Sequence, residues 1–415
     1  MNCLTSKGLR RMKNVPDIRF KGFEDEWISV LFSNIAKISR GLTYSPSCIN
    51  TKGVRVLRSS NIVEGNFCIF DNDIFVNEKS VNIPFAHNKD ILITAANGST
   101  NLVGKHCLIN ISNEEKFVHG GFMLIAKSSE PEFLHYSMFS DWYRRFLRVG
   151  TTGGNGAICN LNKIELAKNK IFVSKYKCEK TKLSIFFVNL DNNIKTLHKI
   201  IASLKQLKSA CLISMFPQQG ETVPRVRFKG FDGEWNEQKA EVIFRQFIEK
   251  NRPDLPVLSA TQDRGMVTRK AIGYDISHDK RNECTYKHIL PGQFVIHLRS
   301  FQGGFAHSDI EGIASPAYTV FEFRDKNQHN DIFWKYIFSS KSFIKQLEKI
   351  TYGIRDGRSI SFDEFKDMKF IIPCVKEQHQ IASYFRNLDI QISEQEKRLE
   401  KLKQIKAACL DKMFV

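Results

Sequence analysis

The sequence lacks the features that mark metal-binding, disulfide-bonded and membrane proteins. Its ten cysteines are scattered, and the closest pair, Cys159 and Cys178, is nineteen residues apart (178 minus 159). Because no C-x-x-C pair exists, a zinc ribbon or a thioredoxin-like site is poorly supported. No apolar run approaches the roughly 20 residues that span a bilayer, and the basic segment 1–14 lacks the apolar stretch of a signal peptide. We therefore expect a cytoplasmic protein with reduced thiols.

Catalytic motifs are missing as well. Residues 82–85, Asn-Ile-Pro-Phe, differ from the Asn-Pro-Pro-Tyr/Phe motif of amino-methyltransferases at the first proline, and no glycine-rich cofactor loop accompanies them. Residues 98–105 imitate a phosphate-binding loop but have one residue too many, and His106 stands where Ser or Thr would bind Mg²⁺. No H-x-x-x-H pair occurs among the eleven histidines, and we interpret His106 beside Cys107 as packing. These absences predict a protein that is not an enzyme and has no metal or cofactor of its own.

Acidic residues are few relative to basic ones. The chain of 415 residues has 62 Lys and Arg against 44 Asp and Glu, a net charge of +18 and a pI near 9.4. This excess attracts polyanions, with nucleic acid favoured over an anionic membrane surface. A basic surface that serves only solubility is the alternative, but +18 is more than solubility requires. With 42% hydrophobic residues, the chain can form two folded domains.

An internal repeat organises the chain. Residues 15–27, VPDIRFKGFEDEW, recur at 223–235 as VPRVRFKGFDGEW, with nine of thirteen positions identical at an offset of 208 (223 minus 15). Residues 204–216 recur at 402–414, at an offset of 198 (402 minus 204). The chain therefore contains two copies of one unit. Their middles have diverged while their ends have not, which suggests one architecture that presents two different recognition surfaces.

The end of each copy is predicted to be a long helix. Apolar residues follow the four-three spacing of a coiled-coil seam, and neither segment contains Gly or Pro. We expect the two helices to bury their seams against each other, with a self-pairing dimer as the alternative. Gln395 and Lys406 are polar interruptions of the second seam. The predicted seam residues are Leu183, Phe187, Leu190, Ile194, Leu197, Ile201 and Leu204, and in the second copy Ile381, Phe385, Leu388, Ile392, Leu399 and Leu402.

The middles are predicted to be mixed α/β, an α+β arrangement. β-rich runs at 53–57, 90–94 and 122–125 have counterparts at 293–298 and 318–323, and turn residues separate them. Helical stretches follow at 132–147 and 331–350, then a glycine-rich loop, and then a strand at 170–173 or 369–372 that leads into the long helix. The predicted segments are a basic tail 1–14, a first domain 15–175, a central helix 176–216, a linker 217–222, a second domain 223–375 and a C-terminal helix 376–415.

The repeated order of variable domain and long helix resembles the specificity subunit of a type I restriction–modification system. The resemblance covers the whole chain and is carried by residues 373–389, PCVKEQHQIASYFRNLD, which are similar to the entry into that family's conserved helix. The first copy departs from this motif, because Lys175 replaces the proline and Lys180 the glutamine, whereas Glu179 and the Leu-Asp pair at 190–191 are kept.

The resemblance implies two target-recognition domains separated by two long antiparallel coiled-coil helices in a pseudo-twofold tandem repeat. Each domain would recognise one half of a bipartite double-stranded DNA target. It implies two methyltransferase (modification) subunits and restriction subunits as partners, and no membrane. S-adenosylmethionine, ATP and Mg²⁺ would be bound by those partners. A stand-alone DNA-binding regulatory protein is the alternative, although such a protein needs no long duplicated helix.

Donor-rich loops after the predicted strands are the candidate DNA-binding segments, because base edges are recognised by Arg, Asn, Gln, Ser and Thr on rigidly placed loops. For any single residue, a role as a turn former or phosphate contact is about as favoured. Arg299 stands out, since a bidentate contact to guanine would suit it. The candidates are Arg55, Arg58, Ser59, Asn61, Thr94, Asn97, Ser99, Asn101, Thr152 and Asn155 in the first copy, and Arg299, Ser300, Gln302, Arg355 and Arg358 in the second.

Two further groups of residues are interpreted as structural. Lys199, Lys205 and Lys208 are expected to form a solvated helix face. The aromatic residues Phe20, Phe23 and Trp27, with their copies Phe228, Phe231 and Trp235, are expected to pack in the core, since a base-stacking role would not require both copies to be the same.

Overall fold

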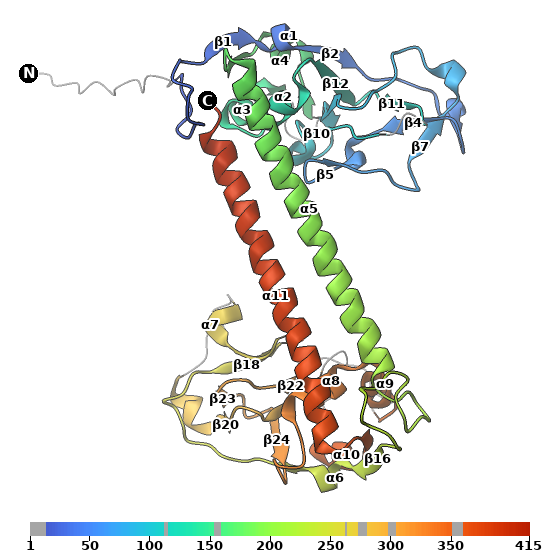
Figure 1. The fold of residues 1–415 in the computed structure, drawn as a ribbon, viewed down its shortest axis with the longest axis vertical. Helices are drawn as coiled ribbons and strands as arrows, with labels where there is room; N and C mark the ends of the chain where they lie inside the picture. The colour runs from blue at the N-terminus through green and yellow to red at the C-terminus, as the bar shows by residue number, and fades with distance from the viewer. Residues whose placement is uncertain are drawn as a thin grey trace, which may run out of the picture. The chain divides into compact units, whose positions relative to one another are not determined.

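The computed structural model describes residues 14–111, 115–152, 159–261, 264–272, 280–297, 304–350 and 360–415 (Figure 1). The chain divides into two compact units. Unit 1 contains residues 1–197 and 398–415, and unit 2 contains residues 198–397. Each unit therefore combines the globular part of one repeat, the first half of its own long helix, and the end of the long helix of the other repeat.

The two long helices are α5, Lys177–Ser214, and α11, Val375–Lys412, each of 38 residues. At 1.5 Å per residue each is about 57 Å long. In unit 1 the first half of α5 packs with the last turns of α11, and in unit 2 the last turns of α5 pack with the first half of α11, so the helices are antiparallel. This arrangement confirms the predicted pair of antiparallel helices. In the described part of the chain no helix is long and apolar enough to cross a membrane.

Unit 1 is built on two four-stranded sheets. The antiparallel sheet has the order β10-β8-β12-β2, and the mixed sheet has the order β11-β4-β7-β3, with β11 parallel to β4. A small sheet, β13-β14-β9, and the pairs β1-β15 and β5-β6 complete the unit. The strands are β1 Ile28–Leu31, β2 Ala36–Arg40, β3 Ile49–Asn50, β4 Val54–Leu57, β5 Ile62–Val63, β6 Asn66–Phe67, β7 Ile74–Val76, β8 Ile91–Thr94, β9 Ala96–Asn97, β10 His106–Leu108, β11 Phe117–His119, β12 Met123–Ser128, β13 Thr151–Thr152, β14 Cys159–Leu161 and β15 Lys170–Val173.

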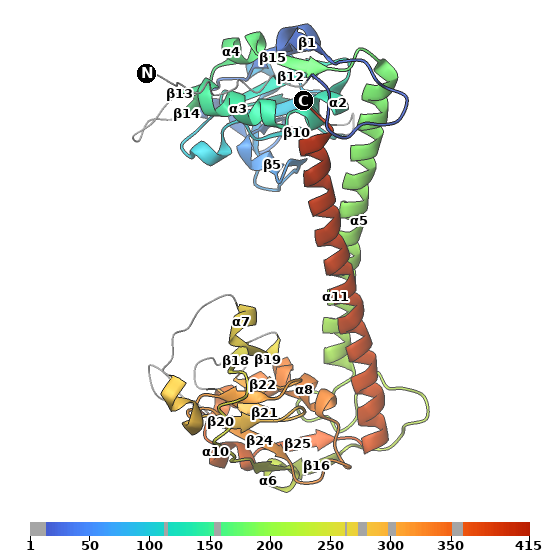
Figure 2. The ribbon, with the colours of Figure 1, turned by 90° about the vertical axis from the view of Figure 1, so that its left-hand side faces the viewer.

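Unit 2 repeats the antiparallel sheet in the order β17-β24-β21-β22, so that β24 takes the place of β12 and β21 that of β8. The pair β16-β25, visible side by side in Figure 2, corresponds to β1-β15, and the pairs β18-β19 and β20-β23 complete the unit. The strands are β16 Asn236–Lys239, β17 Phe244–Gln246, β18 Leu258–Thr261, β19 Gly265–Thr268, β20 Lys287–Ile289, β21 Phe294–Ile296, β22 Phe305–His307, β23 Gly312–Ala314, β24 Thr319–Phe323 and β25 Lys369–Ile372.

The helical stretch predicted in each middle is two helices instead of one. They are α2, Pro131–Ser137, and α3, Asp141–Gly150, in unit 1, and α8, Asp331–Ser339, and α9, Lys341–Ile350, in unit 2. Serine hydroxyls bond to the backbone at each break: the Ser140 hydroxyl donates to the carbonyl of Ser137 (2.7 Å), and the Ser340 hydroxyl accepts from the amide of Phe343 (3.2 Å). Such local bonds compete with those of a continuous helix. The remaining short helices are α1 Phe32–Ile35, α4 Lys163–Lys168, α6 Ala240–Ile243, α7 Arg269–Ile272 and α10 Phe362–Lys366.

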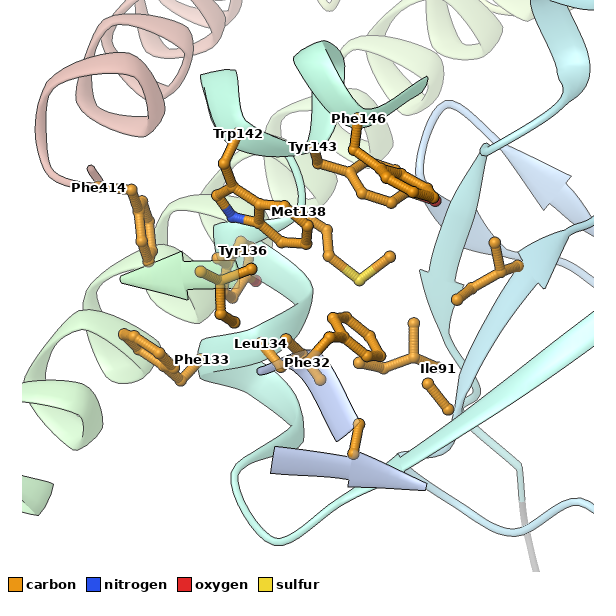
Figure 3. Packing of buried hydrophobic residues seen from close by; sticks show 14 of the residues in the cluster. Phe32, Ile91, Phe133, Leu134, Tyr136, Met138, Trp142, Tyr143, Phe146 and Phe414 are labelled. Carbon is orange, nitrogen blue, oxygen red and sulfur yellow. The ribbon is translucent and has the colours of Figure 1, made fainter. Parts of the chain in front are cut away.

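Equivalent aromatic residues form the core where the helices meet each unit. In unit 1, Phe414, just after α11, lies 6.2 Å from Trp27 and 5.6 Å from Phe187 between ring centroids. Figure 3 shows Phe414 on the same side of this core as Phe133, whose ring centroid lies 5.7 Å away. In unit 2, Phe216 after α5 lies 6.3 Å from Trp235 and 6.0 Å from Phe385. Both tryptophans are buried. The two tryptophans therefore pack in the core, as the sequence predicted, and Phe20 and Phe228 are partly buried against it, whereas Phe23 and Phe231 are half-buried outside these core clusters.

The repeated motif is also joined to its helix by a buried ion pair. In unit 1 the guanidinium of Arg19 donates to both carboxylate oxygens of Glu179 (2.6 and 2.9 Å). In unit 2 Arg227 makes the same two bonds to Glu377 (2.7 Å each). The side chains of both glutamates are 1% exposed. These bonds join the repeated motif to the start of the long helix in the same way in both units.

A second repeated contact joins the two helices within each unit. In unit 2 the ammonium group of Lys208 lies 2.5 Å from the carboxylate of Asp389, which also accepts from the hydroxyl of Tyr336 (2.7 Å). Lys205 pairs with Glu396 (2.7 Å). In unit 1 Lys406 and Tyr136 bind Asp191 in the same way (2.5 and 2.8 Å). The predicted solvated face is confirmed for Lys199 and Lys205, which are exposed, although Lys205 also pairs with Glu396. For Lys208 the prediction is wrong, because its side chain is half-buried against Asp389.

The predicted seam residues are buried or half-buried. Leu183, Phe187 and Leu190 belong to the core of unit 1, and Ile381, Phe385 and Leu388 to that of unit 2. Leu204 and Leu402 are partly buried and pack against these cores. The remaining seam positions, Ile194, Leu197, Ile201, Ile392 and Leu399, are half-buried or buried.

Candidate nucleic-acid interface

Three chain segments of unit 1 that are far apart in sequence meet beyond the ends of β4 and β8. They are residues 58–60 after β4, residues 96–101 after β8, and the paired strands β13 and β14. The small sheet β13-β14-β9 holds the last two together, and the amide of Leu161 donates to the carbonyl of Ala95 (2.7 Å). The fold therefore brings together loops that the sequence predicted separately.

Polar side chains of these loops contact one another. The amide of Asn97 donates to the hydroxyl of Ser59 (3.3 Å), and the Asn97 side-chain oxygen accepts from the amide of Ser99 (2.9 Å). Arg58 and Ser59 are half-buried, and Ser99 and Asn101 are exposed. We call Arg58, Ser59, Asn97, Ser99 and Asn101 the loop surface of unit 1. All five are among the candidates chosen from the sequence.

Arg58 is the cation of the loop surface. Its backbone amide donates to the side chain of Asn61 (2.8 Å), which fixes the start of the loop. Within the described residues its guanidinium takes part in no hydrogen bond or ion pair, and its Nε atom is buried without a partner. A guanidinium with free donors, held on a fixed loop, suits a phosphate or the O6 and N7 atoms of guanine.

Arg55 and Asn61 lie elsewhere, around a buried carboxylate. Arg55 donates to Asp73 (3.1 Å) and to the carbonyl of Phe70 (3.1 Å), and Asn61 donates to both oxygens of Asp73 (3.0 and 3.1 Å). Arg55 is 9% exposed and Asn61 is fully buried. A buried carboxylate needs such partners to offset its loss of hydration. We therefore correct the prediction for these two residues and assign their side chains to the stability of unit 1.

Thr94 is also buried, in contrast to the prediction. It is 1% exposed and pairs with Met123 in the sheet, because it is the last residue of β8 and not part of the loop. Thr152 lies in β13 opposite Asn160. The candidates Asn155, Arg299, Ser300, Gln302, Arg355 and Arg358 lie outside the described residues.

The turn at residues 120–123 adjoins the loop surface and was not predicted to belong to it. The amide of Gly120 donates to the carbonyl of Leu57 (2.9 Å), directly before Arg58. The amides of Ala95 and Ala96 donate to the carbonyl of Phe122 (2.8 and 3.1 Å), directly before Asn97. The Gly-Gly pair at 120–121 is the sequence signal for this turn. It was interpreted only as the boundary before the β-rich run at 122–125.

Unit 2 has an arginine near the corresponding position. Val257, just before β18, bridges Ile313 in parallel, as β4 pairs with β11 in unit 1. Beyond it, Nε of Arg269 donates to the hydroxyl of Ser259 (3.4 Å), and its Nη1 atom is buried without a partner. Sequence reasoning missed Arg269, because it lies on a short helix in a stretch without strong periodicity.

The histidine and cysteine side by side in β10 have a packing role. Both ring nitrogens of His106 lie 3.3 Å from backbone carbonyls, those of Gly104 and His135. Burial lowers the pKa of His106 to about 4, and burial raises the pKa of the Cys107 thiol. No cluster of three or more metal-ligating side chains occurs in the ranges that the structure describes.

The comparisons with known proteins support one family. Residues 237–404 match the family model described as "Type I restriction modification DNA specificity domain". A search of curated proteins finds no match. The fold is similar to the crystal structure of a type I restriction–modification system S subunit from M. genitalium, with a TM-score of 0.59, 13% identity and coverage of 97% of this chain and 99% of that chain. It is also similar to a structure described under complex assembly and conformational transition of the type I R-M system, with a TM-score of 0.50, 14% identity and coverage of 94% and 97%.

Proposed function

We propose that this chain, which belongs with the specificity subunits of type I restriction–modification systems, recognises one half of a bipartite DNA target with each of its two units. The family match over residues 237–404 carries the assignment for unit 2. Unit 1 has the same order of strands in its central sheet and the same contacts to the long helices. Because this common architecture holds different loops, two units can select two different base sequences.

The loop surface of unit 1 supports DNA recognition chemically. It combines a cation without a partner in the described structure, Arg58, with the amide of Asn97 and hydroxyls of Ser59 and Ser99, the groups that recognise base edges and phosphates. The net charge of +18 adds long-range attraction to the duplex.

We further propose that the chain acts as a scaffold and not as an enzyme. Two methyltransferase subunits and the restriction subunits would assemble on it, bringing S-adenosylmethionine, ATP and Mg²⁺ with them. The sequence has no motif for any of these cofactors. We also propose that the assembly acts in the cytoplasm, where the chain would meet its DNA target and partner subunits.

The modular assignment is tested by exchanging residues 236–370 for those of a relative and determining methylated sequences in cells that also produce the modification subunits. We expect only one half of the bipartite motif to change. A change in both halves would contradict the assignment of one unit to one half-site. Binding without any methylated motif would favour a stand-alone regulator.

The proposed lack of catalysis is tested with the purified chain, labelled S-adenosylmethionine and DNA that carries the target. We expect no methyl transfer until modification subunits are added. Methyl transfer by the chain alone would overturn the scaffold proposal and leave the DNA-recognition proposal untouched.

A further inference from the structure

Phe122 is an unusually exposed aromatic residue in unit 1. Its side chain is 65% exposed, whereas Tyr176 and Phe70, the next most exposed aromatic residues in the described structure, are 41% and 40% exposed. A single exposed apolar residue needs no explanation by itself. The position of Phe122 within the fold gives it significance.

The backbone around Phe122 is fixed from three sides. The amide of Met123 donates to the carbonyl of Gly120 (2.8 Å), which closes a four-residue turn with Gly121 and Phe122 at its centre. The carbonyl of Phe122 accepts from two amides of the segment after β8, and Gly120 donates to the end of β4. An added Cβ at Gly120 would lie 3.3 Å from Val56 and 3.9 Å from Arg58, so the turn packs closely against β4. The ring is therefore presented by a rigid element between the two segments of the loop surface.

The surroundings of Phe122 are cationic and polar. Arg40 lies opposite Leu124 on the neighbouring strand, and the carbonyl of Lys105 accepts from the amide of Thr94 at the end of β8. Both residues are exposed. With Arg58 they make three cations on the segments that adjoin the turn or its strand, and within the described residues none of the three forms an ion pair. An apolar ring among unpaired cations and amide donors fits a DNA groove, where phosphates surround the base edges.

Unit 2 has a different residue at this position. Leu124 pairs with Ile93, the third residue of β8, and Thr319 pairs with Ile296, the third residue of β21. Leu124 and Thr319 are therefore equivalent positions in the two units. Counting back two residues from Leu124 and Thr319 places Ala317 where unit 1 has Phe122. Residues that maintain the fold, such as Trp27 and Trp235, are the same in both units. A difference at an exposed position is what a sequence-discriminating contact would show.

We propose that Phe122 is a specificity-determining residue of unit 1, whose ring contacts the methyl group of a thymine in the major groove of the half-site that this unit recognises. The proposal rests on the proposed function. Apolar contact with the C5-methyl group is how a phenylalanine distinguishes thymine from the other bases. Insertion between base pairs is less favoured, because Arg58, Ser59 and Asn97 on the two segments bonded to the turn are suited to base edges in the major groove.

The experiment uses the chain assembled with its modification subunits and a duplex carrying the methylated motif found for the wild type. Each thymine of the half-site is replaced in turn by uracil, which lacks only the methyl group, and affinity is measured by fluorescence anisotropy at fixed salt. For the wild type we expect one replacement to weaken binding about fourfold, the value of one buried methyl group. Phe122→Ala should bind the natural site about tenfold more weakly and should no longer distinguish thymine from uracil.

Two variants serve as controls. Ile28→Ala removes an apolar side chain of 41% exposure from β1, far in sequence from the loop surface, and should bind like the wild type. Phe122→Leu keeps an apolar group at the turn and should retain part of the discrimination. Thermal unfolding should be the same for all variants, because an exposed side chain contributes little to stability.

Several outcomes would overturn the proposal for Phe122. These are unchanged affinity of Phe122→Ala, a half-site without thymine, or no uracil position at which the wild type and Phe122→Ala differ. Increased fluorescence of 2-aminopurine in the wild-type complex, lost in Phe122→Ala, would indicate insertion between bases and would also overturn it. Failure of the proposed function is distinguishable, since the wild-type complex would then show no sequence preference at all.

Discussion

The buried ion pair between Arg19 and Glu179 gives the sharpest test of how unit 1 is held together. Glu179 is 1% exposed and accepts two bonds from Arg19, whose side chain is 10% exposed, and one from the hydroxyl of Ser174. Removing the arginine leaves a buried carboxylate without its main partner. Replacing Glu179 by glutamine removes the charge, while the arginine keeps access to water. The two substitutions should therefore have unequal effects.

The expected magnitude follows from burial. A fully buried pair that loses one partner costs about 3–5 kcal/mol, and a surface pair contributes less than about 1 kcal/mol. Because Arg19 keeps some contact with solvent, we expect Arg19→Met to lower the free energy of unfolding of unit 1 by about 2–3 kcal/mol. This corresponds to roughly a 30- to 150-fold smaller ratio of folded to unfolded protein. Glu179→Gln should cost about half as much, and the double variant little more than Glu179→Gln alone.

Hydrogen exchange followed by mass spectrometry suits this test, because a chain with two units does not unfold as one two-state system. Peptides that cover residues 15–27 and 170–180 should exchange faster in Arg19→Met, in proportion to the loss of stability. Arg225→Met is the matched control, since Arg225 pairs with Glu221 on the surface and is 64% exposed. It should leave exchange unchanged. An effect of Arg19→Met no larger than that of this control would refute the reasoning.

Four further predictions concern pH, internal structure, the long helices and a loop residue. Burial raises the pKa of Glu179, but hydrogen bonds from Arg19 and Ser174 lower it more, so its pKa lies below its ordinary value. The stability that it contributes is present above the ordinary pKa and is lost as the pH falls through the lowered one, and acid unfolding of Glu179→Gln should depend less on pH. Arg55→Ala should destabilise unit 1 by about 3 kcal/mol in the same exchange assay, whereas Arg58→Ala should change stability by less than about 0.5 kcal/mol and weaken DNA binding. Four residues inserted near 196–203 add about 6 Å to α5; methylome sequencing should show the same half-sites with a longer spacer, and an active variant with the original spacer would show that the helices do not measure distance. Arg299→Ala should relax one base position at a cost of about 1–3 kcal/mol, and equal weakening on all sequences with a shallower salt dependence would make it a phosphate contact.

The sequence by itself determined the features that depend on local pattern. The repeat of residues 15–27 at 223–235, the apolar seams of α5 and α11, and the strands β15 and β25 that lead into them were all predicted, because periodicity and identity are properties of contiguous residues. The resemblance to type I specificity subunits came from residues 373–389, where the second helix begins. The predicted central helix, residues 176–216, differs from α5, Lys177–Ser214, by one or two residues at each end. The apolar seam lies inside both ranges, so its prediction is unaffected.

Tertiary structure decided which residues of the loops face outward. Arg55 and Arg58 are three residues apart and equally basic, yet Arg55 is buried against Asp73 while Arg58 keeps a guanidinium without a partner in the described structure. Asp73 lies eighteen residues from Arg55, and Gly120, which donates to the carbonyl of Leu57, lies sixty-three residues from Leu57 (120 minus 57), so no local pattern indicates either contact. Phe122 was treated as the start of a strand, and only its bonds to Ala95 and Ala96 place it beside Asn97. The physical reason is the same in each case. The burial and the hydrogen-bond partners of a side chain depend on segments that meet in space, and these segments are far apart in the sequence.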